Sequence, residues 1–96
     1  MDQMQLLHRA AAGTLESSDC CVTVEPAEGL SLEYTGANSV IFRERTERLA
    51  AEILEKNGVS GAKVAIQDQG AIEITIKARL ETALLRAARP EEEEEI

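Results

Sequence analysis

The feature that most constrains the fold is a change in the spacing of apolar residues along the chain. Four segments alternate apolar and polar side chains: residues 20–25, 30–35, 64–66 and 72–77. Alternation with a period of two is typical of strands that bury one face. Two other segments carry apolar residues at every third or fourth position: 38–57 and 78–89. That spacing is typical of amphipathic helices, so the predicted element order is β-β-α-β-β-α.

This order predicts an α+β fold, a small four-stranded sheet with helices packed on one face. The first two predicted strands are separated by a short turn at Pro26 to Gly29, which favours a hairpin. Asn38 or Ser39 is predicted to cap the long helix, and Asn57-Gly58 to end it. Residues 1–10 show weak helical character.

We expect residues 1–90 to form a single domain, because 96 residues allow one compact core. The five consecutive glutamates of residues 91–96 are predicted to form a disordered acidic tail.

Charge and composition exclude several classes of function. The chain has 18 acidic and 10 basic residues, a net charge of -8, one Phe, one Tyr and no Trp. Nucleic-acid binders usually carry a basic surface and stacking rings, so no nucleic-acid partner is expected. The chain has neither the apolar run of a membrane helix nor that of a secretory signal, which predicts no membrane association and a cytoplasmic location.

The residues that could support catalysis or metal binding are few. His8 is the one histidine, and Cys20 and Cys21 are adjacent, which strains a mutual disulfide. One buried thiol and one exposed or edge-facing thiol are therefore expected, in a reducing compartment, and no metal site. Glu16 and Asp19 could form an acid-base pair, but nothing nearby in the sequence would separate their pKa values. The sequence argues against an autonomous enzyme.

Three segments nevertheless resemble one known family. The stretches AAGTLESSD (11–19), DQGAIE (68–73) and ARLETALLRA (78–87) are similar, in this order, to the acyl carrier (gamma) subunit of citrate lyase. The resemblance implies a non-catalytic carrier in citrate fermentation. Its serine after Leu-Glu, here Ser17, would carry a 2'-(5''-phosphoribosyl)-3'-dephospho-CoA arm through a phosphodiester. Ser18 is the second candidate.

The resemblance also implies how the carrier works. The thiol of the arm would hold acetyl or citryl for the transferase (alpha) and lyase (beta) subunits, which cleave citrate to oxaloacetate and acetate. A prosthetic-group transferase and an acetate ligase would load the arm. The residues that flank the attachment site are Gly13, Thr14, Leu15, Glu16 and Asp19. Two alternatives remain open: the acyl carrier of malonate decarboxylase, and an unmodified protein-interaction module.

Overall fold

The computed structural model describes residues 3–90, which form four strands and two helices. In chain order these are β1 (Ala10–Gly13), β2 (Cys20–Pro26), β3 (Leu30–Gly36), α1 (Arg43–Lys56), β4 (Ala62–Asp68) and α2 (Glu73–Ala88). The predicted α+β class and the four-stranded sheet are confirmed. The acidic tail, residues 91–96, lies outside the described residues.

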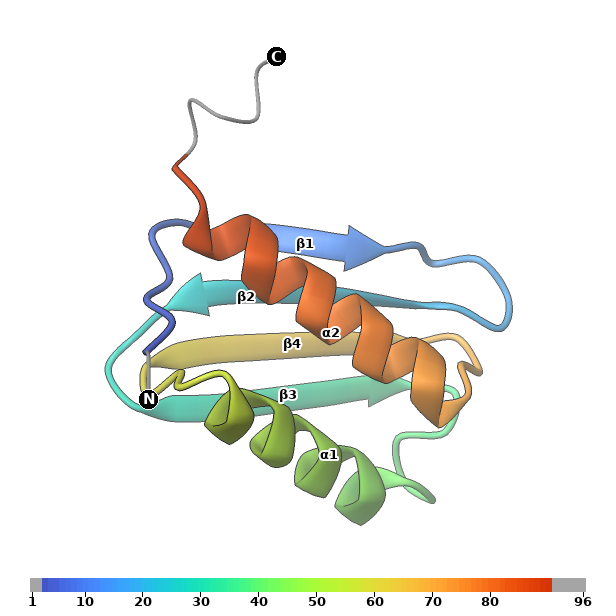
Figure 1. Cartoon of the computed structure of the whole chain (residues 1–96). Coiled ribbons are helices and arrows are strands. Elements are labelled where there is room, and N and C mark those ends of the chain that lie inside the picture. The colour runs from blue at the N-terminus through green and yellow to red at the C-terminus, as the bar shows by residue number, and fades with distance from the viewer. Residues whose placement is uncertain (1–2, 91–96) are drawn as a thin grey trace.

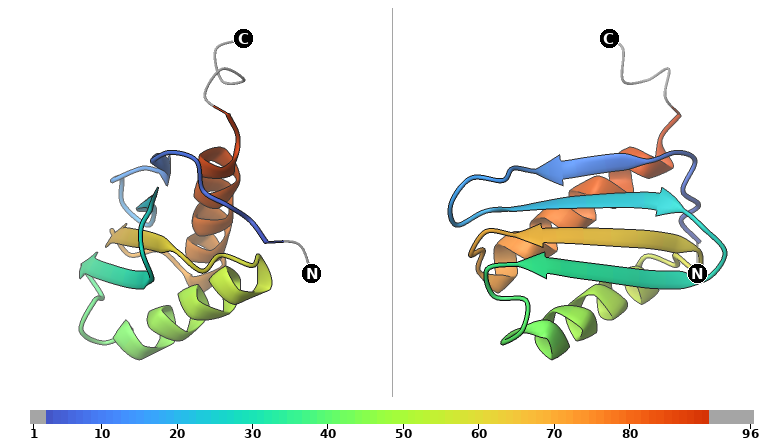
Figure 2. Two further views of the ribbon diagram at one scale, coloured as in Figure 1. Left: turned by 90° about the vertical axis from the view of Figure 1, so that its left-hand side faces the viewer. Right: turned by 180° about the vertical axis from the view of Figure 1, so that it is seen from behind.

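The strands form one mixed sheet in the order β1-β2-β4-β3. β2 is antiparallel to both β1 and β4, whereas β3 is parallel to β4. Both helices cover the same face of the sheet and leave the other face open, as the front and back views show (Figures 1 and 2). The helices on one face agree with the prediction.

The predicted hairpin between residues 20–25 and 30–35 is wrong, because β4 lies between β2 and β3. The connection after β2 crosses the start of β4, where the amide of Ala62 donates to the carbonyl of Gly29 (2.9 Å). A side chain at Gly61 would overlap the carbonyl oxygen of Ala27. The missing Cβ at Gly61 therefore lets the connection pass over β4.

The predicted element order differs from the observed β-β-β-α-β-α at two places. The strand predicted at residues 72–77 is wrong: Ile72 is the N-cap residue of α2, and the helix begins at Glu73. Ile76 starts the buried stripe of this helix, while Ile72 and Ile74 are exposed. The missing strand is β1, four small residues without a β-branched side chain. β1 forms because it pairs with β2, and residues 3–9 before it are not helical.

The start of α1 differs from the prediction, and its end agrees with it. Neither Asn38 nor Ser39 caps the helix; Phe42 is the N-cap residue and makes no side-chain capping bond. At the other end, Gly58 has a φ of 71°, and its amide donates to the carbonyl of Glu55 (3.0 Å). The predicted left-handed stop is confirmed.

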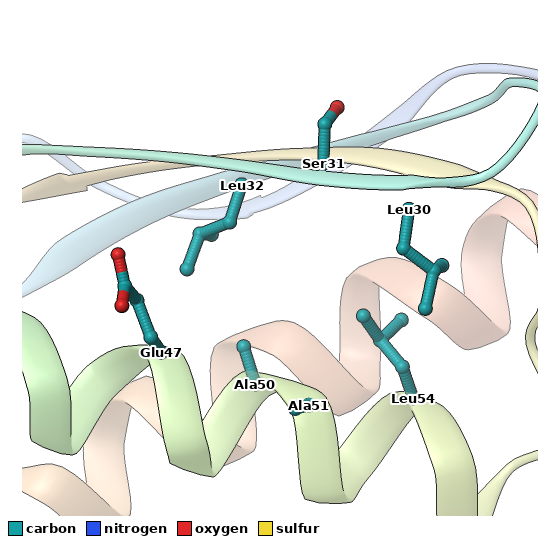
Figure 3. Close-up of a pocket in the computed structure, with 7 residues that line it drawn as sticks. All are labelled: Leu30, Ser31, Leu32, Glu47, Ala50, Ala51 and Leu54. Atoms are coloured by element: carbon teal, nitrogen blue, oxygen red, sulfur yellow. The ribbon is translucent and has the colours of Figure 1, made fainter.

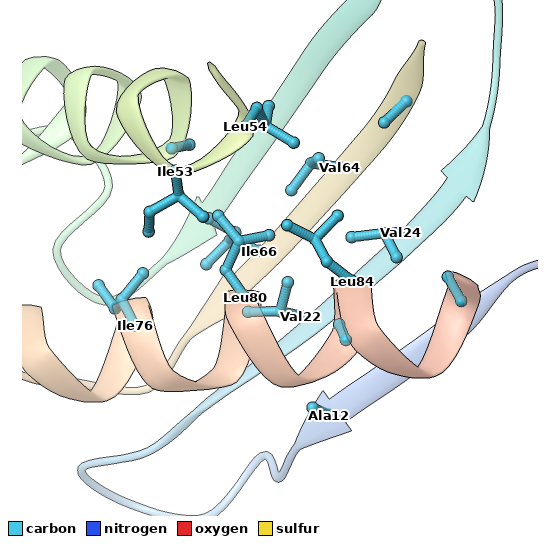
Figure 4. Close-up of a cluster of buried hydrophobic side chains, with 14 of the residues drawn as sticks. Ala12, Val22, Val24, Ile53, Leu54, Val64, Ile66, Ile76, Leu80 and Leu84 are labelled. Carbon is cyan, nitrogen blue, oxygen red and sulfur yellow. The ribbon is translucent and has the colours of Figure 1, made fainter. Parts of the chain in front are cut away.

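The core lies between the sheet and the two helices (Figure 4). The alternate residues of β2 and β4 point into it, together with one stripe from each helix. The residues labelled in the figure are Ala12, Val22, Val24, Ile53, Leu54, Val64, Ile66, Ile76, Leu80 and Leu84. This core anchors the strands that carry the functional loops.

Candidate functional site

A six-residue loop, 14–19, joins β1 to β2 at one end of the sheet and carries both candidate serines (Figure 1). The amide of Asp19 donates to the carbonyl of Glu16 (3.1 Å), which closes a turn with Ser17 and Ser18 in its middle positions. The Ser17 side chain is exposed, and no other residue of the described chain hydrogen-bonds its hydroxyl. The tip of this loop therefore presents a free primary alcohol to solvent.

Gly13 fixes the direction in which the loop leaves β1. Its φ is 100°, and a Cβ there would overlap the carbonyl oxygen of Cys20. The next amide, of Thr14, donates to that same carbonyl (3.2 Å). Glycine is required here for a positive φ and a close approach of two backbones.

Asp19 holds the base of the loop through four hydrogen bonds. It accepts from the Thr14 hydroxyl (2.7 Å), from the Cys20 amide (2.7 Å) and from two nitrogens of Arg79 (3.0 and 2.8 Å). The Arg79 guanidinium, with the other two donors, lowers the pKa of Asp19 far below its usual value. Asp19 therefore stays ionised and has a structural role. It is not suited to act with Glu16 as an acid-base pair.

The segment after β4 braces the other side of the loop. The amide of Ser18 donates to the carbonyl of Gln69 (2.7 Å), and the amide of Gln69 donates to the carbonyl of Asp19 (2.9 Å). Ser18 has a φ of 70°, which is unusual for a residue other than glycine. The backbone on both sides of Ser17 is thus held in place, and the Ser17 side chain stays free.

Asp68 in turn holds the segment that braces the loop. Its buried carboxylate accepts from the Tyr34 hydroxyl (2.6 Å) and from the amides of Gly70 (2.9 Å) and Ala71 (2.8 Å). Burial and this hydrogen bond raise the pKa of Tyr34. Neither Asp68 nor Arg79 is among the site residues predicted from the sequence. One signal was present: Asp68 continues the inward positions of Val64 and Ile66.

Asp19→Asn is expected to remove a pH-dependent part of the stability. The ionised carboxylate stabilises the fold above the unfolded-state pKa of about 3.9, and this stabilisation is lost as the pH falls toward the lowered folded-state pKa. The urea midpoint of the wild type should therefore exceed that of Asp19→Asn at pH 7, and the gap should close on acidification. Arg79→Gln, which removes the other partner, should give a similar curve. A gap that does not change with pH would contradict this role.

The two cysteines and His8 do not form a reactive group with Ser17. Both cysteines are free thiols; Cys20 is buried, as predicted for one of them, whereas Cys21 is half-buried and not exposed. Burial raises the pKa of Cys20 to about 11. The His8 ring lies near the other end of the sheet, with its Nε2 2.7 Å from the carbonyl oxygen of Arg89. Within residues 3–90, no group of His, Cys, Asp and Glu side chains has the arrangement of a metal site.

A small apolar pocket lies far from the loop, between the first half of β3 and α1 (Figure 3). Its volume is about 250 Å³, and its lining residues are Leu30, Ser31, Leu32, Glu47, Ala50, Ala51 and Leu54. Leu30 and Leu32 point toward the helix, whereas Ser31 points away from it. The pocket brings no nucleophile together with a base.

No helix in the described part of the chain is long and apolar enough to cross a membrane.

Comparisons with known proteins identify relatives of the whole domain. Residues 7–87 match the model of the family described as "Malonate decarboxylase delta subunit (MdcD)". A citrate lyase acyl carrier protein from Treponema denticola is 42% identical over 84 residues, 88% of this chain and 97% of that protein. One from Haemophilus influenzae (strain PittEE) is 39% identical over 84 residues, 88% of each chain.

A solved structure shares the fold. A chain in the crystal structure of a Pseudomonas malonate decarboxylase hetero-tetramer in complex with malonate superposes with a TM-score of 0.67 at 21% identity. The match covers 91% of this chain and 92% of that chain. The sheet with helices on one face therefore recurs in a chain of that hetero-tetramer.

Proposed function

The chain belongs to the citrate lyase acyl carrier protein family, and from this premise we propose that the Ser17 hydroxyl is the attachment point of its prosthetic arm. The protein is the acyl carrier subunit of citrate lyase, without catalytic activity of its own. The proposed arm is 2'-(5''-phosphoribosyl)-3'-dephospho-CoA, joined to the Ser17 oxygen by a phosphodiester. When bound, the arm supplies a thiol that carries acetyl or citryl as a thioester.

The observation that carries this proposal is the accessibility of the Ser17 hydroxyl. It is exposed at the tip of a loop, and no described residue hydrogen-bonds its hydroxyl. A prosthetic-group transferase must reach that oxygen and take its proton, and both are accessible. The held backbone around Ser17 presents the oxygen in one place, which lowers the entropic cost of recognition.

The surroundings of Ser17 also suit a thioester carrier. The imidazole of His8 lies near the other end of the sheet, and Asp19 is fixed as an anion by Arg79. In the described chain, no thiol hydrogen-bonds the loop. The carrier therefore brings no activated base close to its cargo, which leaves acyl transfer to the partner subunits.

Tethering gives the carrier its function. An acyl group on a flexible arm reaches a partner active site at a high effective concentration without new contacts to the carrier. We propose that the alpha subunit exchanges acetyl for citryl on the arm and that the beta subunit cleaves the citryl thioester. The transferase that attaches the arm and the ligase that acetylates it would act on the same exposed end.

The malonate decarboxylase alternative is less well supported. The chain matches the family model described by the delta subunit of that enzyme, but the solved subunit is only 21% identical to it. The citrate lyase relatives from Treponema denticola and Haemophilus influenzae are 38% to 42% identical over 84 residues. The related fold is compatible with a similar arm in the two systems. Reconstitution with citrate lyase subunits should cleave citrate, and no malonate decarboxylation is expected.

Mass spectrometry of carrier purified from its native host tests the proposal. We expect the intact mass to exceed the sequence mass by one phosphoribosyl-dephospho-CoA arm. Trypsin cleaves after Arg9 and Arg43, so one peptide contains both candidate serines. Fragmentation that preserves the phosphodiester should place the adduct on Ser17. A homogeneous unmodified chain would instead favour the protein-interaction module.

A further inference from the structure

Exposed apolar side chains gather at the end of the sheet that carries Ser17. Eight large apolar residues of the described chain are exposed, and five of them lie in the loops at this end or in the first turn of α2. These five, the apical patch, are Leu15, Val40, Ile41, Ile72 and Ile74. Their exposure ranges from 57% for Leu15 to 88% for Val40. Single exposed apolar residues are ordinary, but a group of five on three neighbouring loops points to a contact surface.

Hydrogen bonds show that the three loops are neighbours. The Ser17 loop, 14–19, is bonded to the segment after β4 by the amide of Ser18 and the carbonyl of Gln69 (2.7 Å). The end of β4 is bonded to the loop after β3, 37–42, by the carbonyl of Asp68 and the amide of Ala37 (2.9 Å). All three loops lie together at the right-hand end of the molecule in Figure 1.

The fold itself does not use these side chains. The buried stripe of α2 begins at Ile76, and that of α1 begins at Thr46. Ile74 lies two positions before Ile76 and therefore points away from the core. Exposure of apolar surface costs about 25 cal/mol per Å², so a partner that covers the patch would recover free energy.

Taken together, the three segments that carry the apical patch are acidic, although Arg43, Arg45 and Lys77 lie beside them. The segments 14–19, 37–42 and 69–74 contain no Lys or Arg. Glu16 and Glu73 are exposed there, while the charge of Asp19 is neutralised by Arg79. The partner surface that fits is therefore apolar with arginine or lysine at its rim.

We propose that the apical patch docks onto the catalytic subunits of citrate lyase, at the rim of the entrance through which the arm passes. This inference rests on the proposed function, because an arm on Ser17 obliges the partner's entrance to face this end of the carrier. An entrance that admits a phosphate-bearing arm and the carboxylates of a citryl group must be basic. A basic rim complements Glu16 and Glu73, and the apical patch supplies the apolar contact beside them.

Binding of the carrier to purified partner subunits tests this docking surface. Ile74→Glu places a charge in the apical patch, and Leu85→Glu makes the same change on the same helix at an exposed residue outside the patch. The dissociation constant is measured by calorimetry with the unmodified and the arm-bearing carrier. We expect Ile74→Glu to weaken binding about tenfold or more in both forms, and Leu85→Glu to change it less than about twofold. Circular dichroism checks that both variants fold.

Three results would overturn the docking surface: equal losses in the two variants, no loss in Ile74→Glu, or no binding of either form of the wild type. Self-association of the wild type that Ile74→Glu abolishes, without an effect on partner binding, would assign the patch to a second copy of this chain. The test of the docking surface and the test of the Ser17 attachment site can give different results. If mass spectrometry finds no arm on Ser17 but Ile74→Glu still weakens binding, the attachment site fails and the docking surface stands.

Discussion

Ser17→Ala is expected to abolish loading of the carrier by the prosthetic-group transferase. The Ser17 hydroxyl is the proposed nucleophile for the phosphodiester, and alanine has no oxygen to replace it. Because the Ser17 side chain is exposed and unbonded, its removal should leave the fold and the urea midpoint unchanged. Intact mass after incubation with the transferase and the activated arm should show a loading rate below about 1% of the wild-type rate.

The neighbouring serine provides the matched control. Ser18 has a φ of 70°. Ser18→Gly removes the hydroxyl, and glycine adopts a positive φ readily, so the backbone of the loop should be unchanged. Ser18→Gly should load at a rate close to that of the wild type. The reverse pattern, in which Ser17→Ala loads and Ser18→Gly does not, would move the attachment site to Ser18.

Sequence reasoning correctly predicts β2 and β4, the two strands in the middle of the sheet. β2 and β4 bury every second residue, from Cys20 to Val24 and from Ala62 to Asp68. Alternation over seven residues specifies the buried face of a strand strongly. Ile72, Ile74 and Ile76 alternate as regularly as the inward residues of β2, but the strand prediction is wrong there because Ile76 packs with Leu80 on a helix.

The order of strands within the sheet is not encoded by any local pattern. The turn at Pro26 to Gly29 predicts a hairpin from its residues alone, but β2 pairs with β1 and with β4, and β4 lies more than thirty residues further along the chain. β4 displaces β3 because it is apolar at every inward position up to Ile66, whereas β3 buries only Tyr34. Burial of β4 in the centre of the sheet removes more apolar surface from water than burial of β3 would.

The candidate site divides in the same way. The loop that carries Ser17 follows from its glycine, serine and aspartate residues, which favour turns. The contacts that hold the loop do not, since Asp19 and Arg79 are 60 residues apart in the sequence. Asp68 appears in the sequence only as the first residue of the DQGAIE stretch, and its role depends on Tyr34, which is 34 residues away. Such pairs become visible only when the strands are placed beside each other.

Asp68→Ala is expected to cause the largest loss of stability of the substitutions considered. The carboxylate is fully buried and accepts three hydrogen bonds, from Tyr34, Gly70 and Ala71. Its removal leaves three donors without an acceptor, and each buried unsatisfied group costs about 1–3 kcal/mol. We therefore expect the free energy of unfolding to fall by about 3 kcal/mol or more, a large share of a small domain's stability.

Tyr34→Phe separates the polar role of Asp68 from packing. It removes one of the three donors and keeps the ring, so the expected loss is about 1 kcal/mol in urea unfolding. Asp68→Asn keeps an acceptor oxygen for the two amides and should fall between the other two variants. Because Asp68 holds the segment that braces Ser18 and Asp19, amide exchange in loop 14–19 should also accelerate in Asp68→Ala and stay slow in Tyr34→Phe. A smaller loss of stability in Asp68→Ala than in Tyr34→Phe would contradict the role of Asp68, since the brace would then depend on the tyrosine alone.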